Sequence, residues 1–487
     1  MVTNDSDVEL PRRVVDVENP SLPRLIEPKG QKGRYVALSH YWGTPKRCPL
    51  RTTSRNFKLH CAGIPLKHLS QTFRDAIAVT RSIGLRYLWI DSICIIQDDV
   101  SDWEAELDLI GAIFEHAYLT ISASTCDPES DGLFLQYKSP LSLLELPFKD
   151  SRGDENGSLF VGSKRSLTPN LFNSILSKRG WATQEWILSR RMVHYTEEGM
   201  VWACKQATCT EIGMEPVAHF LTPDWIDITW RHSTCRLTFE KDRLASLQGI
   251  AAQLQSTRSD QYIQGLWTGE LSSQLAWRAV RELKPNCDLP DAPSWTWASK
   301  LGGIDSHKYE PYDWYEAFEF LSVTKQWVMK INGFVALADS FTYDSLCSKC
   351  YCENAQEIKR LGSGLDWASG LNDLDLPEIP WESEQIYIVS DCFGEHVGWI
   401  IPDQKGTLDG KEHFLLLNTE IKPTKEWGWL TDLYERAGSF HDSRCKVLVL
   451  RESARKPGTF ERLGIGLLAW KMLGWITSQK PQEILLS

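Results

Sequence analysis

The sequence has no segment typical of a secretion signal, a membrane span or a nucleic-acid-binding region. Residues 1–13 are polar, and the most apolar late stretch, 463–476, is short and contains Lys471. No dense run of lysine and arginine occurs, and the net charge of -11 argues against a nucleic-acid partner. We therefore expect a soluble cytoplasmic protein that neither spans a membrane nor binds nucleic acid.

The common cofactor and metal signatures are also missing. No Gly-x-Gly-x-x-Gly follows the first predicted strand, and no Gly-x-x-x-x-Gly-Lys-Ser/Thr occurs anywhere. The 13 cysteines are scattered through the chain, as expected for reduced thiols. Cys347, Cys350 and Cys352 form one cluster, but no fourth Cys or His follows at the spacing of a metal site. We expect neither a metal site nor a resident cofactor.

The chain of 487 residues is long enough for several domains with a sizeable core. Its 21 tryptophans favour extensive core packing, because each tryptophan buries a large area when it lies inside. Changes in composition and pattern predict a polar N-terminal arm, an α/β domain, a helical and aromatic extension and a mixed, β-rich C-terminal domain. Their predicted ranges are 1–33, 34–205, 206–305 and 306–487.

The α/β domain is predicted from short apolar runs that alternate with segments of helical period. Strands are expected at 34–39, 86–91 and 118–124, with helices at 72–83 and 101–117 between them. Capping boxes at Thr72-x-x-Asp75 and Ser101-x-x-Glu104 are expected to start the two helices. Right-handed crossovers would give a parallel sheet with helices on both faces. Residues 39–43, 91–94 and 122–124 would then meet at one edge of the sheet.

Glu106 is the most informative charged residue of the second predicted helix. At about 100° per residue it falls only about 60° from the centre of the apolar stripe, on the rim of the buried face. The helix starts at the carboxyl edge of the sheet, where ligands bind in open α/β sheets. A structural role also fits, because a carboxylate near a helix N-terminus is favoured by the macrodipole.

Several blocks of the α/β domain together resemble the fungal heterokaryon incompatibility (HET) domain. The blocks keep the order and spacing of that family over roughly residues 35–205. They are Tyr35-Val-Ala-Leu-Ser-His-Tyr-Trp-Gly43, Thr72-Phe-Arg-Asp-Ala-Ile77, Tyr87-Leu-Trp-Ile-Asp-Ser-Ile-Cys-Ile-Ile-Gln-Asp98, Asp102-Trp-Glu-Ala-Glu106 and Arg179-Gly-Trp-Ala-Thr-Gln-Glu185. The chain departs from the usual family pattern at His40, Tyr41 and Ala182.

The resemblance implies a role in fungal non-self recognition, in which such proteins trigger cell death when incompatible strains fuse. It also implies a flavodoxin-like sheet distantly similar to the Toll/interleukin receptor (TIR) fold, some members of which hydrolyse NAD. In those enzymes the working carboxylate lies early on the helix after a central strand, a few residues past a tryptophan. Trp103 and Glu106 occupy that place here. NAD would be a substrate in this interpretation and not a bound cofactor.

The predicted site places Glu106 as the catalytic carboxylate near the developing positive charge on the ribose. The residues expected to bind substrate are Ser39, His40, Trp42, Gly43, Asp91, Ser92 and Trp103. A second segment is expected either to close the site or to form a structural ion pair, and it contains Arg179, Trp181, Gln184 and Glu185. Each of these residues also has a structural interpretation, the tryptophans as core and Asp91 as a cap.

Two other functions remain open from the sequence. In the first, Cys94 is the nucleophile of a hydrolase or transferase, with His40 as base and Asp91 as the orienting group. The aliphatic neighbours of Cys94 favour a buried, inert thiol instead. In the second, the α/β domain is a non-catalytic signalling module that oligomerises and recruits protein partners for incompatibility signalling.

Overall fold

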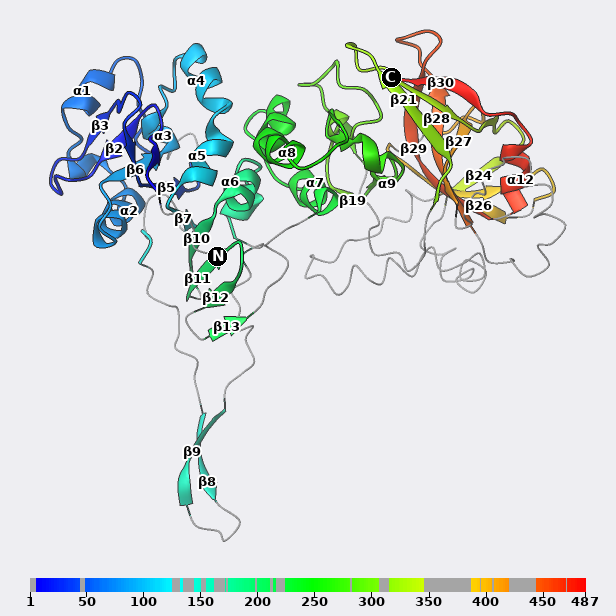
Figure 1. Ribbon diagram of the computed structural model, residues 1–487. Coiled ribbons are helices and arrows are strands. Elements are labelled where there is room, and N and C mark those ends of the chain that lie inside the picture. The colour runs from blue at the N-terminus through cyan, green and yellow to red at the C-terminus, as the bar shows by residue number, and fades with distance from the viewer. Residues whose placement is uncertain are drawn as a thin grey trace. The chain divides into compact units, whose positions relative to one another are not determined.

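Figure 1 shows the computed structural model, which divides into two compact units. The first unit contains residues 1–223, 235–238 and 245–254, and the second contains 224–234, 239–244 and 255–487. The structure describes residues 6–43, 49–124, 132–134, 144–149, 155–161, 171, 174–197, 199–210, 213–215, 224–280, 283–305, 315–345, 387–394, 396–404, 407–419, 444–469 and 471–487.

Four parallel strands form the centre of the sheet in the first unit. They are β5 (Tyr35–Ser39), β6 (Tyr87–Ile90), β7 (Leu119–Ala123) and β10 (Arg191–Thr196). Every residue of β5, β6 and β7 is buried, as expected for strands covered on both faces. The spatial order is β6-β5-β7-β10, which is 2-1-3-4 in chain order and matches the flavodoxin-like arrangement. The prediction of a parallel sheet with flanking helices is confirmed.

The helices lie on both faces of this sheet. Figure 1 shows α2 on one side of the strands and α4 and α5 on the other. Because β6 and β7 pair with opposite edges of β5, right-handed crossovers require opposite faces. The helical segments of the first unit are α1 (Phe57–Ala62), η1 (Leu66–His68), α2 (Gln71–Ser82), α3 (Asp91–Cys94), α4 (Val100–Leu107), α5 (Ile110–His116), η3 (Leu176–Lys178), α6 (Ala182–Leu188), η6 (Ala245–Leu247) and α8 (Gln248–Gln255).

The helix starts differ from the predicted capping boxes. Ser70 caps α2 by accepting a hydrogen bond from Phe73 N, and Asp99 caps α4 by accepting from the amides of Ser101 and Asp102. Both caps have the extended backbone that an N-cap requires, so the helices begin earlier than predicted. The single helix predicted over 101–117 is also wrong. Leu109 N bonds to Glu106 O, and this tight turn ends α4 before α5 begins.

Antiparallel strands extend the sheet on both sides. Before β5, β2 (Val14–Asp16) pairs with β6 and with β3 (Arg24–Ile26), while β1 (Val8–Glu9) and β4 (Lys32–Gly33) form a separate antiparallel pair. Beyond β10 the sheet continues through β11 (Gly199–Cys204), β12 (Thr208–Thr210) and β13 (Gly213–Glu215). β8 (Leu144–Lys149) and β9 (Glu155–Val161) form a separate hairpin.

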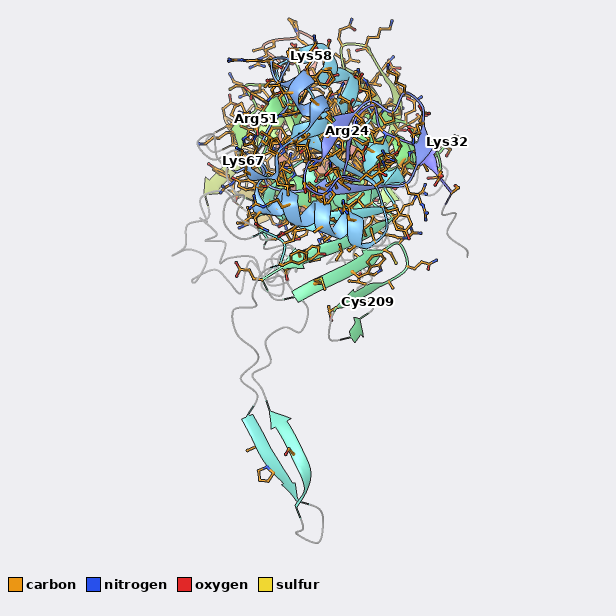
Figure 2. All side chains as sticks on the ribbon, turned by 90° about the vertical axis from the view of Figure 1, so that its left-hand side faces the viewer. Arg24, Lys32, Arg51, Lys58, Lys67 and Cys209 are labelled. Carbon is orange, nitrogen blue, oxygen red and sulfur yellow. The ribbon has the colours of Figure 1, made fainter. Side chains whose placement is uncertain are left out.

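The predicted polar arm is therefore not outside the domain. Val14, Val15 and Leu25 are almost completely buried, and they belong to the same core as β5, β6 and β7. Figure 2 labels Arg24 and Lys32 of this part of the chain, together with Arg51 and Lys58 of the segment that follows β5. The arm was predicted from its polar residues, but two short apolar runs are enough to build two strands.

The second unit is rich in antiparallel strands, as predicted for the C-terminal region. Its large sheet contains β20 (Tyr315–Glu316), β21 (Phe318–Val323), β22 (Met329–Gly333), β23 (Val335–Leu337), β24 (Thr342–Ser345), β25 (Tyr387–Ser390), β26 (His396–Pro402), β27 (His413–Thr419), β28 (Arg444–Glu452), β29 (Phe460–Ala469) and β30 (Gln482–Leu486). The pairs are antiparallel except for β29 with β30. α12 (Lys471–Thr477) follows β29.

The remaining elements of the second unit surround a group of tryptophans. Trp267, Trp277, Trp295 and Trp297 are almost completely buried, which confirms that many tryptophans are core residues. These elements are α7 (Trp225–Ser233), η5 (Glu240–Arg243), η7 (Thr268–Glu270), α9 (Leu271–Gln274), η8 (Trp297–Ser299) and the strand pairs β14 (Tyr262–Ile263) with β15 (Leu266–Trp267), β16 (Arg278–Ala279) with β19 (Ile304–Asp305), and β17 (Lys284–Pro285) with β18 (Lys300–Leu301). Across the described parts of both units, no helix combines the length and apolarity needed to cross a membrane.

The position of β2 and β3 in the sheet predicts that residues 6–33 are needed for folding of the first unit. A chain that starts at residue 34 would expose the edge of β6 and lose several buried valines and leucines. We expect it to lose the cooperative unfolding transition of the first unit in differential scanning calorimetry. A chain that starts at residue 6 is the control and should keep both the transition and its midpoint. An unchanged transition in the shorter chain would show that β2 and β3 are dispensable.

Candidate functional site

The carboxyl ends of β5, β6 and β7 bring polar residues to one edge of the sheet. Ser39 ends β5, Asp91 directly follows β6, and Ser122 lies in β7 opposite Ser39. β6 pairs with one side of β5 and β7 pairs with the other, so the direction in which the chain crosses the sheet reverses at β5. The carboxyl edge at this strand is therefore the topological switch point of the sheet. Ligands of open α/β sheets bind at such a point.

Asp91 lies at the centre of a hydrogen-bonded group at this edge. Its Oδ2 accepts from Trp42 Nε1 at 2.7 Å and from Arg179 Nη2 at 3.2 Å. Its Oδ1 accepts from the amide of Ser92 at 2.6 Å and lies 3.6 Å from His40 Nδ1. The structure thus brings together Asp91, Trp42, His40 and Ser92, as the sequence predicted.

Glu185 joins the same group from α6. Its carboxylate accepts a hydrogen bond from Ser39 Oγ and lies 3.8 Å from Arg179 Nη1. Burial raises the pKa of Glu185 to about 7, although the nearby Arg179 opposes this shift. Glu185 therefore changes its charge near neutral pH, which is unusual for a carboxylic acid and typical of functional sites.

Arg179 links the two carboxylates. One guanidinium nitrogen donates to His40 O at 2.6 Å and the other contacts Asp91, while the guanidinium carbon lies 5.7 Å from the Trp42 ring centre. The Arg179 side chain is 18% exposed, so this cation also faces solvent. The second segment thus lies at the same edge of the sheet, and its Arg179 and Glu185 also form the ion pair that the structural interpretation expects.

His40 and Ser92 have buried polar side-chain atoms without a hydrogen-bond partner among the described residues. These atoms are the two ring nitrogens of His40 and the hydroxyl oxygen of Ser92. Burial lowers the pKa of His40 to about 4, so the ring is neutral at physiological pH. Unpaired buried polar groups are costly and rare, and a bound polar ligand is one way in which they can be satisfied.

A buried polar seam continues from the site between α6 and the sheet, and the sequence prediction missed its far end. Ser122 Oγ lies 3.0 Å from Ser124 Oγ, which lies 3.2 Å from His194 Nδ1. Burial lowers the pKa of His194 to about 3, so this ring is also neutral. His194 lies between Val193 and Tyr195 in β10, and its side chain points to the face of the sheet that α6 covers. A histidine within such an apolar strand is a sequence signal that could have marked it as a buried polar residue.

Glu106 does not lie on the rim as predicted. It is completely buried, and its contacts are to Arg13 Nη2 at 3.2 Å and Arg12 Nε at 3.7 Å. Arg13 also contacts Asp102 at 2.5 Å and donates to Cys94 O. Burial raises the pKa of Glu106, and the two arginines oppose that effect. The helix pattern could not show this environment, because the counter-charge comes from the chain before β2.

The other predicted site residues lie in varied surroundings. Trp103 is half-buried and packs against the core, and Trp181 is the N-cap residue directly before α6. Gln184 is buried and faces Gly249 in α8. Gly43 has a φ of 73°, a left-handed conformation that glycine adopts without strain, where the chain leaves Trp42.

Cys94 has the environment of an inert thiol. It is almost completely buried, and its sulfur accepts a hydrogen bond from Ile90 N. Burial raises the pKa of Cys94 to about 12, so the thiolate is scarce at neutral pH. The described residues contain no group of three metal-ligating side chains. Cys347, Cys350 and Cys352 lie outside the described residues.

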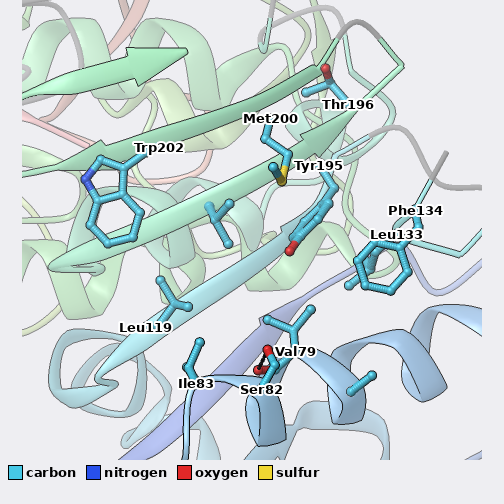
Figure 3. Close-up of a pocket in the computed structure, with 12 residues that line it drawn as sticks. Val79, Ser82, Ile83, Leu119, Leu133, Phe134, Tyr195, Thr196, Met200 and Trp202 are labelled. Carbon is cyan, nitrogen blue, oxygen red and sulfur yellow. Dashed lines mark hydrogen bonds between the residues drawn. The ribbon is translucent and has the colours of Figure 1, made fainter. Parts of the chain in front are cut away.

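An apolar trough of about 630 Å³ lies on the other face of the sheet (Figure 3). Figure 3 shows Val79 and Ser82 of α2, with Ile83 directly after it, on one side and Tyr195, Met200 and Trp202 of the sheet on the other. The described residues that line it carry no charged side chain, and no predicted site residue is among them. The trough is therefore separate from the polar site at the carboxyl edge.

Comparison with known families identifies the domain that holds the site. Residues 35–185 match the family model described as heterokaryon incompatibility protein (HET). The chain carries a HET domain. Ser39, Asp91, Arg179 and Glu185 all lie within the matched part of this domain. Comparison of the chain with curated proteins and with solved structures gave no match.

The raised pKa of Glu185 predicts a stability change with pH. The folded HET domain favours the protonated acid, so this contribution is present below the ordinary pKa of 4.5 and lost as pH rises through about 7. The loss amounts to about 3 kcal/mol. Glu185→Gln should therefore gain stability relative to the wild type over this range in urea unfolding followed by fluorescence. Glu104→Gln, on the exposed side of α4, is the control. Parallel pH curves for wild type and Glu185→Gln would contradict the assignment.

The buried contacts of Arg13 predict a large structural effect. Arg13→Leu would leave Asp102 and Glu106 buried without their main counter-charge, at a cost of about 3–5 kcal/mol in the free energy of unfolding. Arg12→Leu is the matched control, because the Arg12 side chain is 46% exposed and its ion pairs contribute under about 1 kcal/mol. Equal losses for the two variants in chemical denaturation would refute the structural role of Arg13.

Proposed function

We propose that this HET domain acts in heterokaryon incompatibility by hydrolysing NAD at the carboxyl edge of its sheet. The observation that supports the proposal most is the pair of carboxylates, Asp91 and Glu185, that share Arg179 at the switch point. Cleavage of a glycosidic bond commonly uses two carboxyl groups with different environments. Asp91 is the more exposed of the two, and Glu185 is buried with its pKa raised to about 7.

The chemistry assigns a different task to each carboxyl group. The bond between ribose C1′ and the pyridinium nitrogen breaks, and its electron pair leaves with neutral nicotinamide. Asp91 stabilises the positive charge that develops on the ribose. Water adds to C1′ and transfers a proton to deprotonated Glu185, which gives ADP-ribose. No other reactant is required.

The remaining groups of the site suit a dinucleotide. Arg179 is a partly exposed cation that can contact the pyrophosphate, since guanidinium pairs well with phosphate oxygens. Trp42 lies beside it and presents an aromatic face to a ring of the ligand. The unpaired polar atoms of His40 and Ser92 can hydrogen-bond to ribose hydroxyls.

In this proposal Glu185 replaces Glu106 as the working carboxylate. Glu106 is neutralised by Arg12 and Arg13, so it supports the fold of α4 and does not meet substrate. Cys94 has no role in the reaction, because its thiol is buried and protonated.

A non-catalytic signalling module is the second candidate function. It is favoured by the apolar trough, which has Ile83, Phe134, Met200 and Trp202 partly exposed along it. Clustered exposed apolar side chains are typical of a surface that contacts another protein. In this alternative the HET domain self-associates and recruits partners without cleaving NAD.

An assay of nicotinamide release tests the proposed reaction. The full-length chain, concentrated to favour assembly, should release nicotinamide from NAD, with a rate that rises as pH increases through about 7 because the base must be deprotonated. Glu185→Gln and Asp91→Asn should each lower kcat by roughly 10²- to 10⁴-fold. Glu104→Gln serves as the control and should behave like the wild type.

The same preparations separate the two candidate functions. Absence of nicotinamide release at every concentration and pH rules out hydrolysis of NAD. Concentration-dependent light scattering that Trp202→Asp abolishes would then support the non-catalytic module. Release that survives both Glu185→Gln and Asp91→Asn would reject this site even if NAD is cleaved.

A further inference from the structure

Two short segments that follow the HET match in sequence belong to the first unit and contact the site's supporting elements. Residues 235–238 and 245–254 are part of the first unit, whereas the residues before, between and after them belong to the second. The chain therefore changes unit five times between residues 223 and 255. Both segments end close in sequence to elements of the second unit.

The first segment holds the backbone on both sides of Arg179. Arg236 N donates to Lys178 O at 2.7 Å, and Gly180 N donates to Arg236 O at 2.9 Å. These two bonds form an isolated parallel bridge between Arg236 and Arg179. The Arg236 side chain is exposed, so its backbone makes the connection.

The second segment packs against the helix that carries Glu185. A Cβ atom on Gly249 of α8 would lie 2.9 Å from Gly111 Cα, 2.8 Å from Gln184 Oε1 and 3.1 Å from Leu188 Cδ1. Only glycine permits this approach of α8 to α5 and α6. Gln184 is the neighbour of Glu185, so the position of α8 limits how α6 can shift.

We propose that residues 235–238 and 245–254 position Arg179 and Glu185 at the carboxyl edge of the sheet. The inference rests on the proposed function, in which these two side chains work together. Both segments act through the backbone beside Arg179 and through α6, so they are positioning segments and do not contact substrate themselves.

Hydrogen exchange tests the positioning role without any assay of NAD. Arg236→Pro removes the amide that donates to Lys178 O, whereas Arg236→Ala keeps it, so the pair isolates one backbone bond. We expect amides of residues 178–188 to exchange roughly two- to tenfold faster in the full-length Arg236→Pro chain and at the wild-type rate in Arg236→Ala. Unchanged exchange in Arg236→Pro, with the rest of the chain folded, would overturn the proposal.

The pKa of Glu185 gives a second readout that a merely structural role would not move. Arg179 lowers this pKa against the effect of burial, so a displaced Arg179 should raise it above about 7. The measurement is the difference in free energy of unfolding between each chain and the same chain with Glu185→Gln, followed against pH. The pH midpoint of this difference should increase in Arg236→Pro only. An identical midpoint in both Arg236 variants would count against positioning. Both measurements keep their meaning if NAD is not cleaved, so this inference and the proposed reaction can fail separately.

Discussion

The site depends on the placement of the Arg179 guanidinium between two carboxylates. Asp91 follows β6 and Glu185 lies on α6, and without a shared cation these groups would repel each other in a partly buried space. The same guanidinium binds His40 O, so it also fixes the chain directly after β5. One side chain thus connects three elements that are distant in sequence. Because burial outweighs its effect on Glu185, the pKa stays near 7 and the carboxyl group can exchange a proton at physiological pH.

The layer between α6 and the sheet contains polar side chains whose burial reduces the stability of the fold. A helix that covers a parallel sheet usually buries apolar side chains against it. Here Ser39, Ser122, Ser124 and His194 lie in that layer, together with Glu185. Burying these groups reduces stability unless each finds a partner, and local departures from apolar packing are expected at functional sites. The hydrogen bonds of the seam offset part of this cost, and burial keeps His194 neutral by lowering its pKa.

The sequence predicted the arrangement of the strands better than it predicted the surroundings of the charged side chains. Buried runs such as 87–90 are strands in any sheet that is covered on both faces, and the βαβαβ order then determines which ends meet. That reasoning placed Ser39 and Asp91 correctly at one edge. It failed for Glu106 because a helical pattern shows which face is buried but not which distant residue supplies a counter-charge. Arg13 lies 93 residues away in sequence, in a region whose strands are too short to show a period.

The HET match covers only part of the first unit, so its motifs leave out residues that support the site. The match ends at Glu185, at the middle of α6, yet the sheet continues through β10 and begins before β5. Arg13 neutralises the buried carboxylates of α4, and His194 ends the polar seam, although both lie outside the match. Arg236 holds the backbone beside Arg179 from still further along the chain. The residues that could carry chemistry are thus local in sequence, whereas the residues that fix their charge and position are not. Because the pKa of a buried carboxyl group depends on the latter, the protonation state of Glu185 is a property of the complete first unit.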